Sequence, residues 1–427
     1  MSPFRRHSRV LSASLAGTAV EFYDFYIFGT AAALVFGPLF FPASSPSAQL
    51  LLAYATFGVA FIARPVGAVA FGHFGDRIGR KSTLVASLLI MGLSTFAIAL
   101  LPTYAVAGVI APLLLCVLRF GQGFGLGGEW SGAALLAVEN APPGWQGRFG
   151  CVPQLGAPLG FIASNGLFLL LGLWLSPAEF AAWGWRIPFA LSLVLVGIGL
   201  WVRLRLAETP AFREALAQAP PPRLPLGEVF ATAWRPLLAG TLGVIACFAV
   251  FYLATAFALG YATTTLGLPR ERMLALQLGA ILFLAIGIVI AGWLSDRWSP
   301  RRVLVLGCFG TVLAGVLLPI GLVAGDEVRL FGWLALALGA MGLVYGPLGA
   351  WLPSLFAARV RYTGTGLAFN VGGVLGGGLT PFAAQWVSSA GRGLAPVGVY
   401  LAVAGGLSLF GLRVLARESV GVRAAAR

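Results

Sequence analysis

The sequence predicts an all-α polytopic membrane protein, with twelve transmembrane helices in two pseudo-symmetric six-helix bundles. Three observations lead to this fold class. Of the 427 residues, 59% are hydrophobic and 10% are charged, whereas an average soluble domain is about 25% charged. Twelve apolar stretches are long enough to cross a bilayer. In addition, one glycine-containing polar loop occurs twice, half a chain apart.

Each predicted span is a stretch of about 20 mostly apolar residues, the length that a bilayer core requires. In chain order, the spans are predicted at Leu11–Phe36, Leu50–Phe71, Thr83–Leu101, Ala105–Gly128, Gly150–Leu173, Pro188–Leu206, Pro236–Tyr261, Leu274–Leu294, Val303–Val323, Leu330–Leu352, Gly364–Val387 and Val397–Leu415. The longest polar segment, residues 207–235, separates six spans from six. We therefore predict an N-terminal bundle over 1–206, a cytoplasmic linker over 207–235, and a C-terminal bundle with a short basic tail over 236–427.

The formal net charge of +14 does not indicate a nucleic-acid partner, because uncharged runs such as residues 29–62 and 83–118 interrupt the basic residues. The basic residues instead alternate between the two sides of the predicted spans. Loops on one side carry 21 Lys and Arg, loops on the other side carry 5, and Arg64 and Arg119 lie inside spans. Since cytoplasmic loops are the basic ones, we predict a multi-pass protein of a bacterial-type inner membrane with both termini cytoplasmic. We also predict that it functions as a monomer.

The repeated loop is Gly72–Lys81 after the second span and Gly292–Arg302 after the eighth. Their first glycines are 220 residues apart, about half of the chain. Duplicated halves are typical of secondary transporters, whose two bundles rock about a site at the bilayer midplane. A channel has no evident need for such a repeat.

The first of these loops resembles the signature of the major facilitator superfamily, Gly-x-x-x-Asp-Arg-x-Gly-Arg-Lys. Further stretches resemble its metabolite:proton symporter family: Glu21-Phe-Tyr-Asp-Phe-Tyr26, Arg64-Pro-Val-Gly67, Arg119-Phe-Gly-Gln-Gly-Phe-Gly-Leu-Gly-Gly-Glu-Trp130, Trp183-Gly-Trp-Arg-Ile-Pro-Phe189, Glu208-Thr-Pro-Ala-Phe212 and Arg361-Tyr-Thr-Gly-Thr-Gly366. The resemblance covers nearly the whole chain.

The resemblance implies a cytoplasmic gate formed by the two loops. In the first loop it implies gating by Gly72, Asp76, Arg77 and Arg80, with Asp76 facing the positive N-terminal end of the eleventh span. In the second loop the corresponding residues are Asp296 and Arg297. That loop departs from the pattern at Trp298-Ser-Pro, which weakens the case for gating by this half.

Glu21 and Asp24 are the candidate proton-coupling residues. A charge in the bilayer core is costly, so an ionisable residue there indicates function, and i, i+3 spacing places both carboxyl groups on one helix face. Two neighbouring carboxylates in a low dielectric disfavour full ionisation, so one of them binds a proton readily. The structural alternative is an ion pair that holds helices together.

Arg119, in the fourth span, cannot lose its proton and needs an anion nearby. We expect Glu21 or Asp24 to supply it in the unloaded protein, and the substrate carboxylate to replace them through two parallel hydrogen bonds. Gln122 shares a helix face with Arg119 and is a candidate for the same site. Glu129 lies about 15 Å further along the axis and better fits a cytoplasmic gate. The glycines between these residues are predicted to allow close helix packing rather than dinucleotide binding.

The candidate hydrogen-bonding residues of the site are Tyr23, Tyr26, Tyr252, Tyr345 and Asn370. With Arg119 as one fixed cation, they suit an organic acid with few carboxylates. We therefore predict a proton-coupled importer of a small mono- or dicarboxylate, including polyhydroxylated acids. One alternative is symport of a zwitterionic osmolyte such as betaine or proline, with cation–π contacts to Tyr23, Tyr26 or tryptophans. The other is an uncoupled facilitator. The sequence contains no arrangement typical of an enzyme, a cofactor site or a metal site.

Overall fold

The computed structural model describes residues 3–42, 44–78, 80–205, 225–357 and 360–415, and side chains at 3, 6, 9, 72–84, 202–205, 225, 392, 414 and 415 lie outside the description. The N-terminal half consists of α1 (Pro3–Arg6), α2 (Ser8–Ala31), η1 (Ala32–Phe36), α3 (Gly37–Phe40), α4 (Pro46–Ile78), α5 (Arg80–Ala99), α6 (Tyr104–Ala107), α7 (Ile110–Leu126), α8 (Glu129–Glu139), α9 (Gln146–Gln154), α10 (Gly156–Trp174), α11 (Pro177–Glu179), η2 (Phe180–Gly184) and α12 (Arg186–Arg205).

The described part of the C-terminal half likewise consists of helices joined by short connections. It consists of α14 (Pro225–Thr232), α15 (Trp234–Tyr252), η3 (Leu253–Phe257), α16 (Ala258–Thr264), α17 (Arg270–Arg297), α18 (Pro300–Gly321), α19 (Glu327–Ser354), α20 (Arg361–Gly373), η4 (Val374–Gly378), α21 (Thr380–Val387), η5 (Ser388–Arg392), α22 (Ala395–Phe410) and η6 (Gly411–Leu415). The η segments are π-helical and continue neighbouring α-helices.

Each of the twelve predicted spans coincides with a helix or with successive helices, which confirms the predicted fold class. Within the described residues, ten helical segments are long and apolar enough to span a bilayer, and the bent pair Pro177–Gly184 and Arg186–Trp201 makes an eleventh. The third predicted span is α5, whose described apolar stretch, Val85–Ala99, is shorter. The fourth span was predicted too short, because the helix continues through α8 to Glu139.

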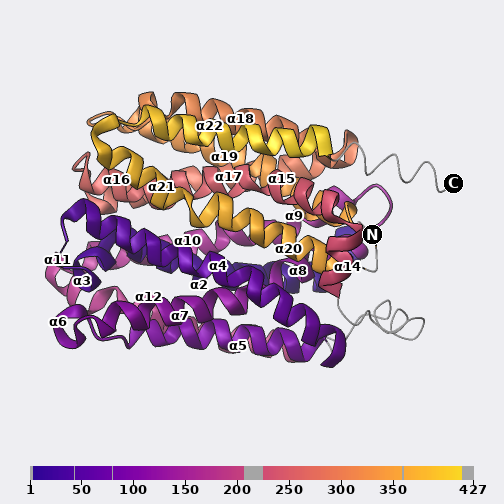
Figure 1. The fold of residues 1–427 in the computed structure, drawn as a ribbon, viewed down its shortest axis with the longest axis horizontal. Helices are drawn as coiled ribbons and strands as arrows, with labels where there is room; N and C mark the ends of the chain where they lie inside the picture. Colours follow the sequence, from indigo (N-terminus) through magenta and orange to yellow (C-terminus); the bar gives the residue numbers. More distant parts are fainter. Residues whose placement is uncertain (1–2, 43, 79, 206–224, 358–359, 416–427) are drawn as a thin grey trace.

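The helices run side by side along the long axis of the molecule, with the N-terminal half in the lower part of Figure 1 and the C-terminal half in the upper part. The described chain begins and ends at the same end of the bundle, which we name the terminal end; the opposite end, with α3, α6 and α16, is the distal end (Figure 1). The two halves meet where α4 packs against α20 and η4, and where α9 and α10 pack against α17.

Glycine permits the close packing of the fourth span, as the sequence predicted. A β-carbon at Gly123 would lie 2.2 Å from the backbone oxygen of Ala60, and one at Gly127 would lie 2.2 Å from that of Arg64. No side chain fits at such distances, so α7 and α4 are in backbone contact. This contact fixes the positions of Arg64 on α4 and Arg119 on α7 relative to each other.

Candidate functional site

Asp24 is fully buried on α2 and has no cation partner in the described chain. The Ser192 hydroxyl donates a hydrogen bond to its Oδ1, and its Oδ2 has no hydrogen-bond partner. Glu21, one turn earlier, is also buried and interacts electrostatically with Arg64 on α4. The first span therefore brings two carboxyl groups into the protein interior, as predicted.

Arg119 is fully buried on α7 among aromatic rings. Its guanidinium carbon lies 4.0 Å from the ring centroid of Phe28, 4.4 Å from that of Phe25 and 5.0 Å from that of Phe57. These cation–π contacts stabilise the charge in part. The expectation that Glu21 or Asp24 pairs with Arg119 is wrong, since no Asp or Glu oxygen of the described chain lies within ion-pair distance of the Arg119 guanidinium. Its Nε and Nη2 have no hydrogen-bond partner.

Gln122 connects Arg119 to the first span. Arg119 Nη1 donates to Gln122 Oε1. The Gln122 amide in turn donates to the backbone oxygen of Asp24 at 2.7 Å and to the Thr95 hydroxyl at 2.9 Å. All hydrogen-bonding groups of the Gln122 side chain are thus used, and the amide holds Arg119 and Asp24 in one polar cluster.

Arg64 is a second buried cation, which the sequence reasoning missed as a site residue. Only 3% of its surface is exposed, and its Nε has no hydrogen-bond partner. Its guanidinium carbon lies 5.4 to 5.8 Å from four ring centroids, two from the N-terminal half, Phe25 and Phe61, and two from the C-terminal half, Phe248 and Phe369. Arg64 therefore lies between the halves. The prediction that Arg119 is the one fixed cation of the site is wrong.

Three of the predicted tyrosines lie near Arg64. Tyr26, Tyr252 and Tyr345 are buried and interact electrostatically with this guanidinium. Tyr23 does not join them, because its hydroxyl donates to the backbone oxygen of Pro188 on α12 at 2.9 Å. The structure thus gathers one acid, one arginine and three phenols from both halves at the centre of the bundle.

Asn370 bridges the halves rather than lining the cluster around Arg64. Its amide nitrogen donates to the backbone oxygen of Gly127 at 2.8 Å, and its Oδ1 has no hydrogen-bond partner. Next to Asn370 in the chain, Phe369 stacks on Trp130 with ring centroids 3.6 Å apart and planes 1° from parallel. The α8–α20 contact therefore closes the centre of the bundle toward the terminal end.

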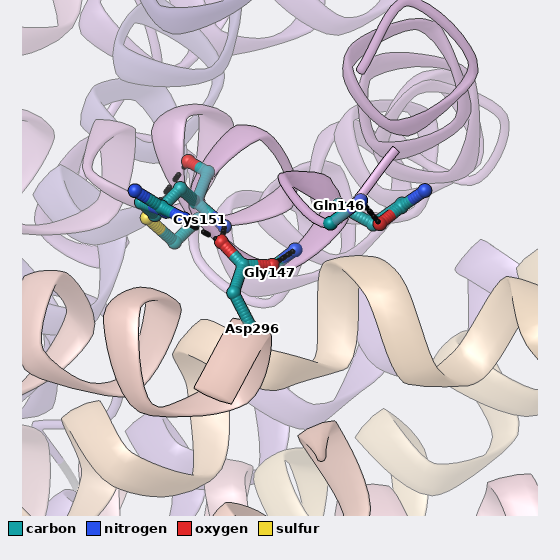
Figure 2. A network of polar contacts seen from close by, with 6 residues as sticks. Gln146, Gly147, Cys151 and Asp296 are labelled. Carbon is teal, nitrogen blue, oxygen red and sulfur yellow. Dashed lines mark hydrogen bonds and ion pairs between the residues drawn. The ribbon is translucent and has the colours of Figure 1, made fainter. Parts of the chain in front are cut away.

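Asp296 joins the halves at the terminal end. Located near the end of α17, it accepts hydrogen bonds from the backbone N–H groups of Gly147 at 2.7 Å and Arg148 at 3.2 Å. It also forms an ion pair with Arg148 Nε at 2.6 Å. Figure 2 shows the Asp296 side chain pointing across to the first turn of α9. The N-terminus of a helix carries partial positive charge, so this position favours an anion.

The remaining predicted gate residues have mixed outcomes. Side chains of Gly72, Asp76, Arg77 and Arg80 lie outside the described residues. Arg297 lies 4.1 Å from the ring centroid of Trp293 on its own helix and forms no ion pair within the described residues. Arg148 instead forms the ion pair with Asp296 at this end of the molecule. Sequence reasoning had only counted it as a basic loop residue.

Glu129 was expected about 15 Å beyond Arg119, at a cytoplasmic gate. The structure buries it at the start of α8, where the hydroxyl of Ser87 on α5 donates to its Oε1 at 2.5 Å. The reason is that the fourth span continues to Glu139, so Glu129 lies inside the span. The expectation that Glu129 lies just beyond the fourth span is therefore wrong, and its role in gating stays a prediction.

The distal end is also closed by contacts between the halves. The Tyr54 hydroxyl donates to the backbone oxygen of Ala256 at 2.6 Å, and the Gln385 amide donates to the Ser47 hydroxyl at 3.3 Å. The central residues are thus enclosed between two closed ends. Among the described residues, no group of three or more His, Cys, Asp or Glu side chains is placed to hold a metal ion.

Comparisons with known proteins agree with this architecture. The sequence profile of the Major Facilitator Superfamily matches residues 14–381. The chain is 46% identical to the inner membrane metabolite transport protein YhjE of Escherichia coli K12, over 96% of this chain and 94% of that protein. It is 39% identical to the shikimate transporter of the same organism, over 89% of this chain and 87% of that protein.

The fold is similar to that of a solved transporter. Superposition on the proton:xylose symporter XylE, which is 15% identical, gives a TM-score of 0.73 over 95% of this chain and 94% of that chain. The matches are to transport proteins and not to enzymes. The chain belongs to the Major Facilitator Superfamily and is one of its metabolite transporters.

Proposed function

We propose that this transporter imports a small organic acid together with protons, across a bacterial inner membrane, with its terminal end in the cytoplasm. The observation that carries the proposal is the pair of buried guanidinium groups, Arg64 and Arg119. Neither has a carboxylate within ion-pair distance in the described chain, although Arg64 interacts electrostatically with Glu21. A buried cation without a counter-ion is costly. A substrate carboxylate supplies the missing charge.

Arg64 is the better placed of the two for substrate. It lies between rings of both halves, and transporters of this architecture bind substrate at the interface between their halves. Tyr26, Tyr252 and Tyr345 lie around it and hydrogen-bond substrate hydroxyls. This set suits a hydroxylated carboxylic acid. Shikimate, which appears in the name of a relative that is 39% identical to this chain, has that chemistry.

Asp24 is the proposed proton carrier. Its carboxyl group is buried without a cation, an environment that favours the neutral form of the acid. Gln122 links its backbone to Arg119, so a change of charge at Asp24 alters the surroundings of Arg119. Glu21, which interacts with Arg64, is the second candidate. Proton binding at these acids and anion binding at the arginines then favour each other.

Alternating access follows from the contacts at the two ends. The Asp296–α9 contact closes the terminal end, and the Tyr54 and Gln385 contacts close the distal end. Opening either end separates the halves while the central residues keep their positions within each bundle. A ligand that binds the closed form better than the open forms shifts the population toward it.

The test is uptake by purified protein in liposomes. Labelled shikimate, other mono-, di- and tricarboxylates, proline and glycine betaine are supplied with an imposed pH gradient and after its collapse. We expect concentrative uptake of an acid that disappears on collapse. Accumulation of betaine or proline instead would establish the osmolyte alternative, and equal uptake with and without the gradient would establish the uncoupled facilitator.

Variants then assign the roles. We expect Asp24→Asn to lose gradient-driven accumulation but to retain substrate exchange, and Arg64→Gln to lose both. Arg272→Gln is the matched control, since Arg272 is an exposed arginine at the distal end that pairs with Glu327. If Arg64→Gln transports like Arg272→Gln, the proposed site at Arg64 is wrong.

A further inference from the structure

The C-terminal half has an apolar groove on its outer surface, away from the central site. A cavity of about 530 Å³ lies between α18 and α19. On α18 it is lined by Leu306, Phe309 and Leu313, each 45 to 48% exposed. On α19 it is lined by Ala335, Leu336, Gly339, Ala340 and Leu343. A surface of this kind in a bilayer faces lipid chains.

Two cations lie at the end of the groove nearer the terminal end. Arg302 is four residues before Leu306 and seven before Phe309, so it continues the groove-lining face of α18 by one turn. From η6, which follows α22, the Arg413 guanidinium carbon lies 5.4 Å from the ring centroid of Phe309. Neither arginine belongs to an ion pair of the described chain.

Arg301 fixes this arrangement. Its Nε donates to the backbone oxygen of Leu412 at 2.9 Å, and its Nη2 donates to that of Arg413 at 3.4 Å. These bonds attach the end of the last span to the start of α18. The Arg413 side chain is therefore held beside Phe309, and the two cations remain close to the same groove.

We propose that this groove binds one anionic phospholipid, with its phosphate between Arg302 and Arg413 and an acyl chain along Leu306, Phe309 and Leu313. The charge and the apolar surface occur in the order that a phospholipid presents them, and basic pockets beside transmembrane helices bind anionic headgroups. The lining from Leu306 to Leu313 is about 10 Å long. This is about a third of a bilayer core of about 30 Å, which fits a chain of one leaflet and is short for a partner helix.

Native mass spectrometry of the full, delipidated protein tests the proposal. The protein is titrated with phosphatidylglycerol and, in parallel, with phosphatidylcholine that carries the same acyl chains. We expect one phosphatidylglycerol to bind more tightly than any phosphatidylcholine. The double variant Arg302→Gln, Arg413→Gln is expected to weaken that binding by about 30-fold and to leave phosphatidylcholine binding unchanged. Equal binding of the two lipids by the wild type would overturn the proposal.

Gly339→Leu tests the groove separately from the charges. Gly339 lines the groove, and a β-carbon there meets only Phe283 Cβ, at 3.9 Å, so a larger side chain is accommodated at this position without a backbone clash. Gly332→Leu on the same helix is the matched control, because a β-carbon there meets nothing within 4 Å and Gly332 lies outside the groove. We expect only Gly339→Leu to weaken phosphatidylglycerol binding. If both variants bind lipid like the wild type, or if Gly339→Leu abolishes a dimer instead, the lipid site is wrong.

Discussion

Asp296→Asn is the most informative perturbation of the terminal end. The substitution keeps the size of the side chain and removes its negative charge. In the structure that charge accepts two backbone hydrogen bonds at the start of α9 and pairs with Arg148 Nε at 2.6 Å. The asparagine retains an acceptor for Gly147 N–H but turns an N–H donor toward the guanidinium donor. We therefore expect the terminal end to open more often.

The magnitude follows from these contacts. A hydrogen bond to a charged group contributes about 1.5–3 kcal/mol, compared with about 0.5–1.5 kcal/mol for a neutral one. An anion at a helix N-terminus contributes about 0.3–2 kcal/mol. The loss for Asp296→Asn is then about 2–4 kcal/mol, which raises the open population by about 30-fold to 1,000-fold.

Alkylation of Cys151 measures this opening. Cys151 lies on α9 and is buried against α17, where a β-carbon at Gly292 would lie 2.6 Å from its sulfur. Separation of α9 from α17 exposes the thiol, so its rate of reaction with a water-soluble maleimide follows the open population. Alanine replaces the other three cysteines, Cys116, Cys247 and Cys308, all of which are free thiols.

Asp326→Asn is the matched control. Asp326 caps α19, where it accepts from the backbone N–H of Arg329 at 2.9 Å and pairs with Arg329 Nε at 2.9 Å. The chemistry is that of Asp296, but the contact lies within one helix at the distal end. An unchanged labelling rate in Asp296→Asn, or an equal rise in both variants, would refute the reasoning.

Three further predictions concern the centre, the packing and the distal end. Arg64→Lys keeps the charge but loses the planar fork; we expect KM for the transported acid to rise about tenfold or more in liposome uptake, with gradient dependence retained. Gly123→Ala brings a β-carbon to 2.2 Å from a backbone oxygen of α4, so we expect the midpoint temperature of unfolding in detergent to fall by several degrees. Gly166→Ala is the control, because a β-carbon there meets nothing within 4 Å, and we expect its midpoint temperature to be unchanged or higher. Tyr54→Phe removes the 2.6 Å bond to Ala256, and a cysteine at residue 256 should react about threefold to tenfold faster with thiol reagents than in the Tyr54 background.

The spans were predictable because their signal is local. A run of about 20 apolar residues must cross the bilayer whatever its neighbours are, and all twelve predicted spans coincide with helices. The end of the fourth span was not predictable in the same way. Glu129 ends the apolar run in the sequence, but Ser87 on α5 supplies a hydrogen bond to its carboxyl group within the bundle. Such compensation comes from a distant residue and leaves no local signal.

The centre of the bundle was predictable in its residue types and not in its pairings. Charge inside a predicted span indicated Glu21, Asp24 and Arg119 as site residues. Arg64 meets the same criterion, but in the sequence it was interpreted only as part of a motif. What surrounds each charge depends on helix packing. Arg119 was expected beside a carboxylate, but the i, i+3 partner Gln122 and the rings of α2 and α4 occupy that space. Spacing within one helix does not report what the next helix contributes.

The second repeated loop illustrates which part of a motif the physics requires. Its departure from the signature at Trp298 weakened the case for Asp296 as a gate residue. The contact that Asp296 makes needs only a carboxylate and the free N–H groups at the start of α9, and residues beyond the helix end take no part in it. Gly147 is the residue that cannot change, because a β-carbon there would lie 2.8 Å from Asp296 Oδ1 and 2.7 Å from the backbone oxygen of Gly292.

The contacts at the two ends differ in kind, and this difference bears on the direction of transport. The described hydrogen bonds between the halves at the distal end, from Tyr54 and Gln385, are neutral, and Arg270 adds a cation–π contact with Phe180 at 4.0 Å. The contacts at the terminal end include the charged hydrogen bonds and ion pair of Asp296 with Arg148. Because charged hydrogen bonds contribute about twice as much as neutral ones, the distal end costs less to open. We expect the empty protein to open there first. If the terminal end lies in the cytoplasm, as we propose, the site then opens to the outside, which the proposed import requires.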